Sequence, residues 1–102
     1  MRIPVNAAPC SDKLKVLADP TRLAVVELLL AGPRRVAELQ KKIRIEQSLL
    51  SHHLGILREA KLVTAVRVGK GVKYQIAPDV ARAVAGNVLD LGCCRISFGK
   101  GT

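Results

Sequence analysis

The spacing of apolar residues predicts two helices in the first third of the chain. The first covers about residues 11–18, where Ser11 or Asp12 caps a segment whose leucines share one face. The second begins at Pro20, with Asp19 as its cap, and ends before a Gly-Pro pair. Residues before position 11 lack such a pattern, so we predict a flexible arm over 1–10.

Two further amphipathic segments follow closely. One covers about Arg34 to Ile43 and the other about Gln47 to Ala60, each with apolar residues three and four positions apart. Only three residues, Arg44 to Glu46, separate them. So short a connection is typical of a helix-turn-helix rather than of a linker between independent units.

The pattern then changes from helical to extended. Two β-prone runs, Leu62 to Val68 and Val72 to Ile76, are joined by Gly69-Lys70-Gly71. A short glycine-containing connection between two such runs predicts a β-hairpin. Directly after a helix-turn-helix, a hairpin takes the position of a wing.

A last apolar stripe predicts a closing helix that starts at about Asp79 and reaches Cys93 and Cys94. The stripe consists of Val80, Val84, Val88 and Leu91. We therefore predict a mainly α winged helix-turn-helix over residues 11–94, with a hairpin wing and a basic, poorly ordered tail over 95–102. The apolar faces of the first and last helices exceed what so small a domain covers alone, which favours a homodimer with a palindromic DNA site.

Composition and charge narrow the choice of partner. The 102 residues are 49% hydrophobic, which excludes a disordered chain, and only 2% aromatic, which disfavours recognition by stacked aromatic platforms. The net charge is +9, and ten basic and three acidic side chains lie between Arg34 and Lys73, a net +7. The basic excess thus lies on the predicted helix-turn-helix and wing, where double-stranded DNA would be met.

A membrane partner fits less well. The longest apolar stretch, Leu23 to Ala31, contains Glu27 and is shorter than the ~20 residues of a spanning helix. The N-terminal residues also lack the apolar segment of a secretory signal. We therefore expect a cytoplasmic protein without a membrane contact.

Candidate DNA contacts lie on the polar face of the fourth helix and on the wing. Because leucines at 50, 54 and 57 occupy the inward face, small polar side chains face outward, as a helix reading the major groove requires. Ser48 can instead cap the helix, and His53 can lie half-buried against the wing. Adjacent histidines diverge on a helix, which disfavours a metal site at this pair. The candidates are Gln47, Ser48, Ser51, His52 and His53 on the helix, and Arg67, Lys70 and Lys73 on the wing.

Three stretches of the chain resemble the ArsR/SmtB family of winged-helix repressors. They are residues 17–23 (LADPTRL), 47–54 (QSLLSHHL) and 57–60 (LREA), and the resemblance covers about residues 12–92. Lys61 stands where the family usually has a helix-ending glycine. The resemblance implies a homodimer formed by the first and last helices, repression of an operator near the protein's own gene, and release by an inducer. No cofactor is expected for DNA binding itself.

Three cysteines are candidates for the inducer site. A dimer could bring the Cys93-Cys94 pair near Cys10, and three thiolates suit arsenite or antimonite, whereas tetrahedral zinc needs a fourth ligand. Some arsenic-sensing members of the family carry a similar pair with a third cysteine after it, which Cys10 would have to replace here.

Other roles for these cysteines remain open. A redox or sulfur-species switch is one. A bond between neighbours is strained, since adjacent Cα atoms are about 3.8 Å apart, so a disulfide would involve Cys10. The cysteines can also be small hydrophobes without chemistry.

Two other functional classes compete with a repressor. A winged-helix module can contact proteins or RNA instead of DNA. An enzyme using the cysteine pair as a dithiol has little support, because the sequence has no Cys-x-x-Cys and no plausible Ser/His/Asp set.

Overall fold

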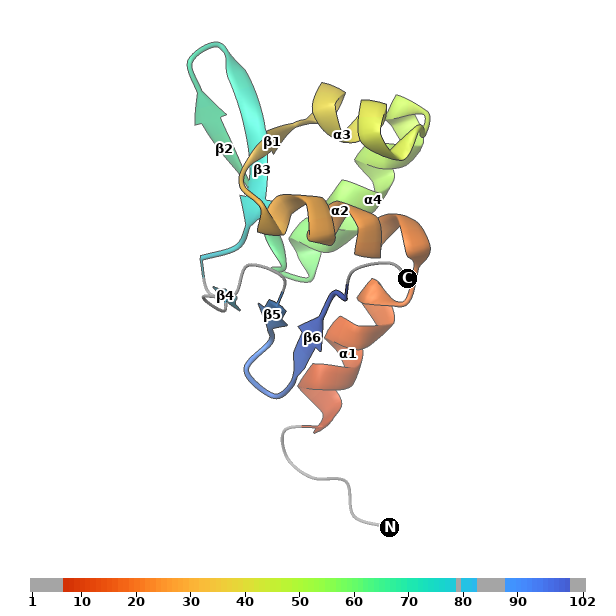
Figure 1. The fold of residues 1–102 in the computed structure, drawn as a ribbon, viewed down its shortest axis with the longest axis vertical. Coiled ribbons are helices and arrows are strands. Elements are labelled where there is room, and N and C mark those ends of the chain that lie inside the picture. Colours follow the sequence, from red (N-terminus) through yellow and green to blue (C-terminus); the bar gives the residue numbers. More distant parts are fainter. Residues whose placement is uncertain (1–6, 79, 83–87, 100–102) are drawn as a thin grey trace.

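A computed structural model describes residues 7–78, 80–82 and 88–99 (Figure 1). Within these ranges four helices precede and flank a hairpin, and a small second sheet follows. The helices are α1 (Ala7–Leu17), α2 (Pro20–Leu30), α3 (Val36–Ile43) and α4 (Gln47–Glu59). The strands are β1 (Arg34–Arg35), β2 (Val63–Val68), β3 (Gly71–Ile76), β4 (Ala81–Arg82), β5 (Val88–Asp90) and β6 (Arg95–Ser97). The winged helix-turn-helix prediction is confirmed.

Helix α2 begins where its cap predicts. The Asp19 side chain accepts hydrogen bonds from the backbone N–H groups of Thr21 (2.8 Å) and Arg22 (3.0 Å), and Pro20 occupies the first turn, where no N–H is needed. Helix α1 begins at Ala7, four residues before the predicted boundary, so residues 7–10 are helical rather than part of an arm. Residues 1–6 lie outside the described residues.

The helix-turn-helix consists of α3, a turn at Arg44 and α4. Arg44 has a φ of 60°, and its N–H donates to the carbonyl of Gln40 (2.8 Å), which ends α3. The prediction that the third helix starts at Arg34 is wrong by two residues. Arg34 and Arg35 form β1 instead, because they pair with Tyr74 and Lys73 of β3. Contacts some 40 residues apart thus override the local helical pattern.

The end of α4 is closed by Lys61 in place of a glycine. Lys61 has a φ of 62°, its N–H donates to Arg58 (2.9 Å), and the N–H of Leu62 donates to Leu57 (3.0 Å). These two bonds form a Schellman motif, which is completed by the buried side chains of Leu57 and Leu62. The cap therefore forms, although a lysine holds a conformation that favours glycine.

The wing is an antiparallel hairpin of β2 and β3, and its sheet has the order β1-β3-β2. Val63 pairs with Ile76 at its base and Val68 with Gly71 at its tip. The base is buried in the core, whereas Val68 and Val72 near the tip are exposed. Figure 1 shows the hairpin projecting from the helices, so its tip is free to reach a partner.

The predicted closing helix is wrong over the residues described. Val88–Asp90 and Arg95–Ser97 are strands, and β4, β5 and β6 form a second antiparallel sheet. Leu89 and Leu91 are buried while Val88 and Asp90 are half-buried, which is the two-residue period of a strand. Val84 lies outside the described residues.

This second sheet also changes the expected surface. Val80 and Leu91 pack into the chain's own core rather than forming an open stripe, and β6 occupies the start of the predicted tail. The core joins leucines and valines from α2, α3, α4, the wing and this sheet. No helix in the described part of the chain is long and apolar enough to cross a membrane.

Candidate functional site

The recognition helix α4 presents a polar face to solvent. Its apolar residues Leu50, Leu54 and Leu57 are at most 1% exposed, so the helix is fixed to the core along one side. The exposed side chains on the other side are those of Gln47, Ser48, Leu49, Ser51 and His52. Four of the five predicted helix contacts therefore lie where a DNA groove could reach them.

Ser48 is engaged with a neighbour at the start of α4. Its hydroxyl donates to the carboxylate of Glu46, the N-cap residue. Glu46 makes no side-chain cap bond, and Ser48 is itself inside the helix, so the alternative of Ser48 as the cap is wrong. The hydroxyl remains exposed beside Gln47.

His53 is turned away from the DNA-reading face. It is only 8% exposed, and its Nδ1 lies 3.0 Å from Nη1 of Arg22 in α2. A DNA contact does not match this placement, and the polar contact that His53 makes is with α2. The physical reason is helical geometry: His53 stands next to Leu54 and three residues after Leu50, which puts it on the inward side of α4.

The predicted wing contacts surround the hairpin tip. Arg67 and Lys70 are exposed and Lys73 is half-buried. Gly69 has a φ of 61°, a conformation that suits glycine in a tight turn. The turn therefore places Lys70 at the tip, with Arg67 and Lys73 behind it on the two strands.

Arg35 is a wing residue that the sequence did not single out. It pairs with Lys73, and its guanidinium lies against Gly71, where a Cβ would be 1.8 Å from Nη1. Gly71 therefore leaves room for an exposed cation beside the wing tip. No local signal predicts this contact, because 36 positions separate the two residues.

Arg34 and α3 add further positive charge. A shared surface hollow is lined by Arg34, Glu38, Lys41, Lys42 and Arg44. Four of these five side chains are cations. The predicted basic character of the helix-turn-helix is therefore present on the folded surface as well as in the sequence.

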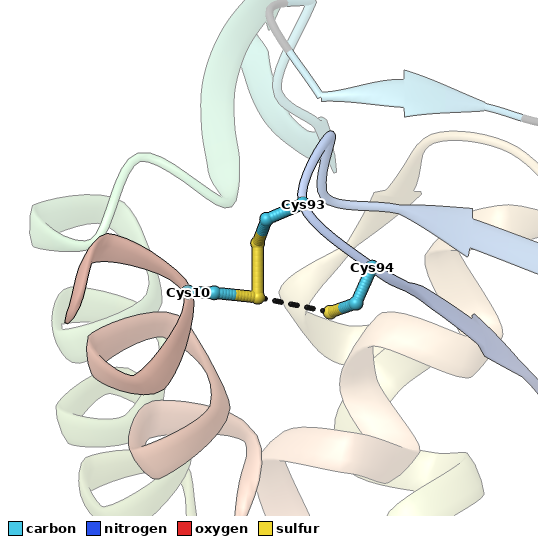
Figure 2. Close-up of side chains that lie close together, drawn as sticks. All are labelled: Cys10, Cys93 and Cys94. Atoms are coloured by element: carbon cyan, nitrogen blue, oxygen red, sulfur yellow. Dashed lines mark hydrogen bonds between the residues drawn. A yellow bond between two sulfur atoms is a disulfide. The ribbon is translucent and has the colours of Figure 1, made fainter. Parts of the chain in front are cut away.

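The three cysteines meet on the other side of the molecule. Cys10 lies in α1, whereas Cys93 and Cys94 lie in the turn between β5 and β6 (Figure 2). Cys10 and Cys93 form a disulfide with a Cα–Cα distance of 6.0 Å, and Cys94 Sγ is 3.0 Å from Cys10 Sγ. All three sulfur atoms lie within 4.8 Å of one another.

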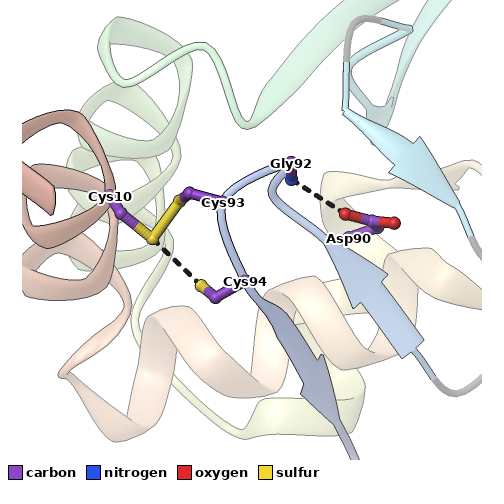
Figure 3. Close-up of a disulfide and its surroundings, with 5 residues drawn as sticks. All are labelled: Cys10, Asp90, Gly92, Cys93 and Cys94. Carbon is purple, nitrogen blue, oxygen red and sulfur yellow. Dashed lines mark hydrogen bonds between the residues drawn. A yellow bond between two sulfur atoms is a disulfide. The ribbon is translucent and has the colours of Figure 1, made fainter. Parts of the chain in front are cut away.

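The turn that carries two of these cysteines is organised by Asp90. Its carboxylate accepts from the N–H of Gly92 (2.8 Å) and from Nε of Arg95 (3.2 Å), and the N–H of Leu91 donates to the carbonyl of Cys94 (2.9 Å). Figure 3 shows the bond between Asp90 and Gly92. Gly92 has a φ of 89°. These bonds turn the chain back within four residues, so neighbouring cysteines both face α1.

The cluster is accessible from solvent. Cys10 is buried at 8% exposure, Cys94 is half-buried and Cys93 is exposed. A small ion or oxidant can therefore reach the sulfurs through Cys93. One chain brings the three residues together, although the sequence left open whether two subunits are needed.

The part of the chain that matches a known family contains the helix-turn-helix but none of the cysteines. Residues 19–65 match the family described as bacterial regulatory protein, arsR family. This chain belongs to the ArsR family. The matched segment runs from the cap of α2 into β2, so it contains α2, α3 and α4, while all three cysteines lie outside it. ArsR members and the relatives found are transcriptional regulators rather than enzymes.

Individual relatives agree with this assignment. An HTH-type transcriptional regulator (Rv0081) of Mycobacterium tuberculosis is 46% identical over 77 residues, which cover 74% of this chain and 68% of the relative. A probable mercury resistance operon repressor of Streptomyces lividans is 37% identical over 95 residues, 85% of this chain and 76% of that protein. The structure of HlyU from Vibrio cholerae superposes with a TM-score of 0.69 at 32% identity, covering 74% and 82%. The chain is thus an ArsR-family, DNA-binding transcriptional repressor, which disfavours the protein- or RNA-binding module.

Proposed function

We propose that this repressor binds a palindromic double-stranded DNA operator as a homodimer and leaves it when Cys10, Cys93 and Cys94 bind a thiophilic ion such as arsenite or antimonite. The observation that carries the proposal is the convergence of three sulfurs within 4.8 Å from segments 83 residues apart. Sulfur ligands select soft ions, and three of them satisfy a trigonal metalloid.

The DNA-binding half of the proposal rests on exposed polar and basic side chains. Gln47, Ser48, Ser51 and His52 would contact bases or phosphates in the major groove. The wing would contact the DNA backbone or minor groove through Arg67, Lys70 and Lys73. We add Arg35 to these residues because its guanidinium lies against Gly71 at the wing tip. We leave His53 out of this set of DNA contacts because its side chain is buried.

The thiophilic ion is supported by the donor set and by two relatives. One relative is named a probable mercury resistance operon repressor, and a similar solved structure is titled a possible transcriptional regulator for arsenical resistance, with a TM-score of 0.62 and 38% identity. Ion binding requires three free thiolates, so the Cys10–Cys93 disulfide must first be reduced.

The disulfide itself favours a second candidate, a redox switch. Oxidation of the Cys10 and Cys93 thiols by hydrogen peroxide forms the S–S bond, and the two protons and two electrons that the thiols lose reduce the peroxide to two water molecules. One similar structure is titled reduced HlyU from Vibrio cholerae. In this alternative the bond between α1 and the β5–β6 turn, rather than an ion, changes DNA affinity.

The homodimer is a proposal of its own. It is supported by family membership and by Leu14 of α1, which is 42% exposed. Because the described residues contain no closing helix, we assign the interface to α1. Sedimentation of the reduced protein at micromolar concentration tests it, and a monomer under DNA-binding conditions would contradict it.

One variant separates the two inducers. Cys94→Ser removes the third ligand but leaves Cys10 and Cys93 able to form their bond. Fluorescence anisotropy of the full chain, reduced with a phosphine, is measured on duplex DNA from upstream of its own gene during arsenite or peroxide titration. If the ion is the inducer, arsenite releases the wild type and not Cys94→Ser.

The remaining outcomes are equally informative. Release of both proteins by peroxide, with no effect of arsenite, identifies the redox switch. Cys10→Ser is the control that removes both routes, because it leaves only two sulfur ligands and a neighbouring pair whose disulfide is strained, and it should stay bound in either titration. Absence of specific binding by the reduced wild type would contradict the repressor itself, and Ser51→Ala with His52→Ala should weaken binding if α4 reads the operator.

A further inference from the structure

A polar chain links the helix of Cys10 to the recognition helix through the interior. Nε of Arg22 donates to the carbonyl of Val16 near the end of α1, and Nη1 of Arg22 contacts Nδ1 of His53 in α4 at 3.0 Å. The backbone N–H of Arg22 is bonded to Asp19, which caps α2. One guanidinium therefore bridges three helices.

Only one assignment of hydrogen-bond donor and acceptor is possible in this bridge. A guanidinium carries donors and no acceptor, so Nδ1 of His53 must accept, and the neutral ring then carries its proton on Nε2. The Val16 carbonyl lies at the negative end of α1, which stabilises the cation there. The position of Arg22 thus depends on α1, and that of His53 depends on Arg22.

Helix α1 joins the sulfur cluster to this bridge. Cys10 and Val16 lie six residues apart in the same helix, about 9 Å along its axis. A helix is stiff over this length, so a displacement imposed at Cys10 by an ion or a disulfide also moves the Val16 carbonyl. Because Arg22 holds His53, the displacement reaches α4 beside Ser51 and His52.

We propose that Arg22 and His53 are positioning residues that couple the state of the cysteine cluster to the recognition helix. This inference rests on the proposed function, since it supplies the route by which an inducer at the cysteines loosens DNA binding. Each residue acts through its neighbour and touches neither the ion nor the DNA. A solely structural role predicts lost stability or lost DNA affinity with unchanged response to inducer, whereas coupling predicts a changed response.

The test compares variants that keep or remove the acceptor. His53→Leu removes it at similar size, and His53→Asn restores an acceptor close to the place of Nδ1. Arg22→Lys keeps the charge but loses the fork that bridges two partners. Arg58→Lys, at an exposed position in the last turn of α4, controls for the exchange of an arginine for a lysine away from the bridge.

The readout is the ratio of DNA affinities without and with inducer, measured on the reduced full chain with arsenite and on the oxidised chain after peroxide. Arsenite binding is followed separately by thiolate absorbance, and folding by thermal melting. We expect His53→Leu and Arg22→Lys to bind arsenite and DNA nearly as the wild type does. Their ratio of DNA affinities without and with inducer should be about tenfold smaller than that of the wild type, which is within the usual range of allosteric coupling. His53→Asn should recover most of it, and Arg58→Lys should match the wild type.

The outcomes separate this inference from the proposed function. A wild type that is released by neither inducer contradicts the proposed function, and the coupling with it. A wild type that is released, together with folded His53→Leu and Arg22→Lys that are released equally well, overturns the coupling alone. If His53→Leu does not fold, Arg22→Lys decides. Reciprocity gives a further check, since DNA must weaken arsenite binding in each protein by the same factor by which arsenite weakens DNA binding.

Discussion

Single residues fix where the helices α2 and α4 of the DNA-binding region begin and end. Asp19 starts α2, and Lys61 ends α4 in the left-handed conformation where glycine is usual. The two caps lie at opposite ends of the matched family segment. Their side chains can be changed without touching the exposed face of α4, so they test stability separately from DNA binding.

Replacing Lys61 with glycine should stabilise the protein. The left-handed conformation strains a residue with a Cβ, and glycine relieves this strain at some entropic cost, so we expect a gain of about 0.5–1 kcal/mol in the free energy of unfolding. Urea denaturation measures it. Lys13→Gly, in the middle of α1, is the control and should lose up to about 1 kcal/mol. Equal losses for both variants would show that the φ of Lys61 carries no strain.

Asp19 should make stability depend on pH in the acid range. The hydrogen bond from the Arg22 N–H lowers the pKa of Asp19, burial opposes this, and the Arg22 charge lowers it further. A pKa that is lower in the folded state stabilises the protein above the ordinary value of 3.8, and this contribution disappears as the pH falls through the folded pKa. Asp19→Asn keeps a capping side chain but does not titrate. Urea titrations between neutral and acid pH should show a steeper loss for the wild type, and parallel profiles would contradict the assignment.

At the scale of elements, the wing depends on its junction with β1. The helical pattern predicted Arg34 and Arg35 as part of the third helix, yet pairing with β3 makes them a third strand of the wing sheet. This pairing brings the Arg35 guanidinium over Gly71. The wing therefore carries a cation that comes from before the helix-turn-helix.

Gly71→Ala should weaken DNA binding without unfolding the wing. The new methyl group would meet the movable end of Arg35, so the guanidinium shifts while the hairpin stays paired. We expect a several-fold loss of operator affinity by anisotropy. Arg35→Ala should lose at least as much and reduce the salt dependence by about one phosphate contact. In the Arg35→Ala background Gly71→Ala should add nothing, and an additive loss would assign the effect to the backbone instead.

At the scale of the whole molecule, the cysteines connect the N-terminal part of the chain to its C-terminal part. The Cys10–Cys93 bond closes a loop of 83 positions and ties α1 to the second sheet. A bond across so long a loop reduces the freedom of the unfolded chain. The oxidised and reduced proteins should therefore differ in stability as well as in any DNA response.

Reduction should lower the free energy of unfolding by about 2–4 kcal/mol, the usual contribution of a disulfide. Urea denaturation with and without a phosphine measures the difference. Cys10→Ser is the matched control and should resemble the reduced wild type under both conditions, because without Cys10 neither Cys93 nor Cys94 can bond to α1. Identical curves for the oxidised and reduced wild type would show that the bond adds no stability.

The sequence by itself determined the helices α2, α3 and α4, the hairpin and the family. These features depend on local signals: the Asp19-Pro20 cap, the leucine spacing of α4 and the glycines of the wing turn. Local periodicity was insufficient beyond residue 79, where valines and leucines fit a helix or a strand equally well, and pairing between β5 and β6 decided for strands.

Only the tertiary structure decided where the chemistry lies. Cys10 meets Cys94 across 84 positions, Arg22 meets His53 across 31, and Arg35 meets Gly71 through the wing sheet. The sequence named the cysteines as a candidate set, but their convergence in one chain follows from packing α1 against the β5–β6 turn. The polar character of His53 put it among the predicted DNA contacts, although its spacing from Leu50 and Leu54 points inward, and only the fold shows that Arg22 of α2 meets it there. Such contacts depend on how elements pack, which no local pattern encodes.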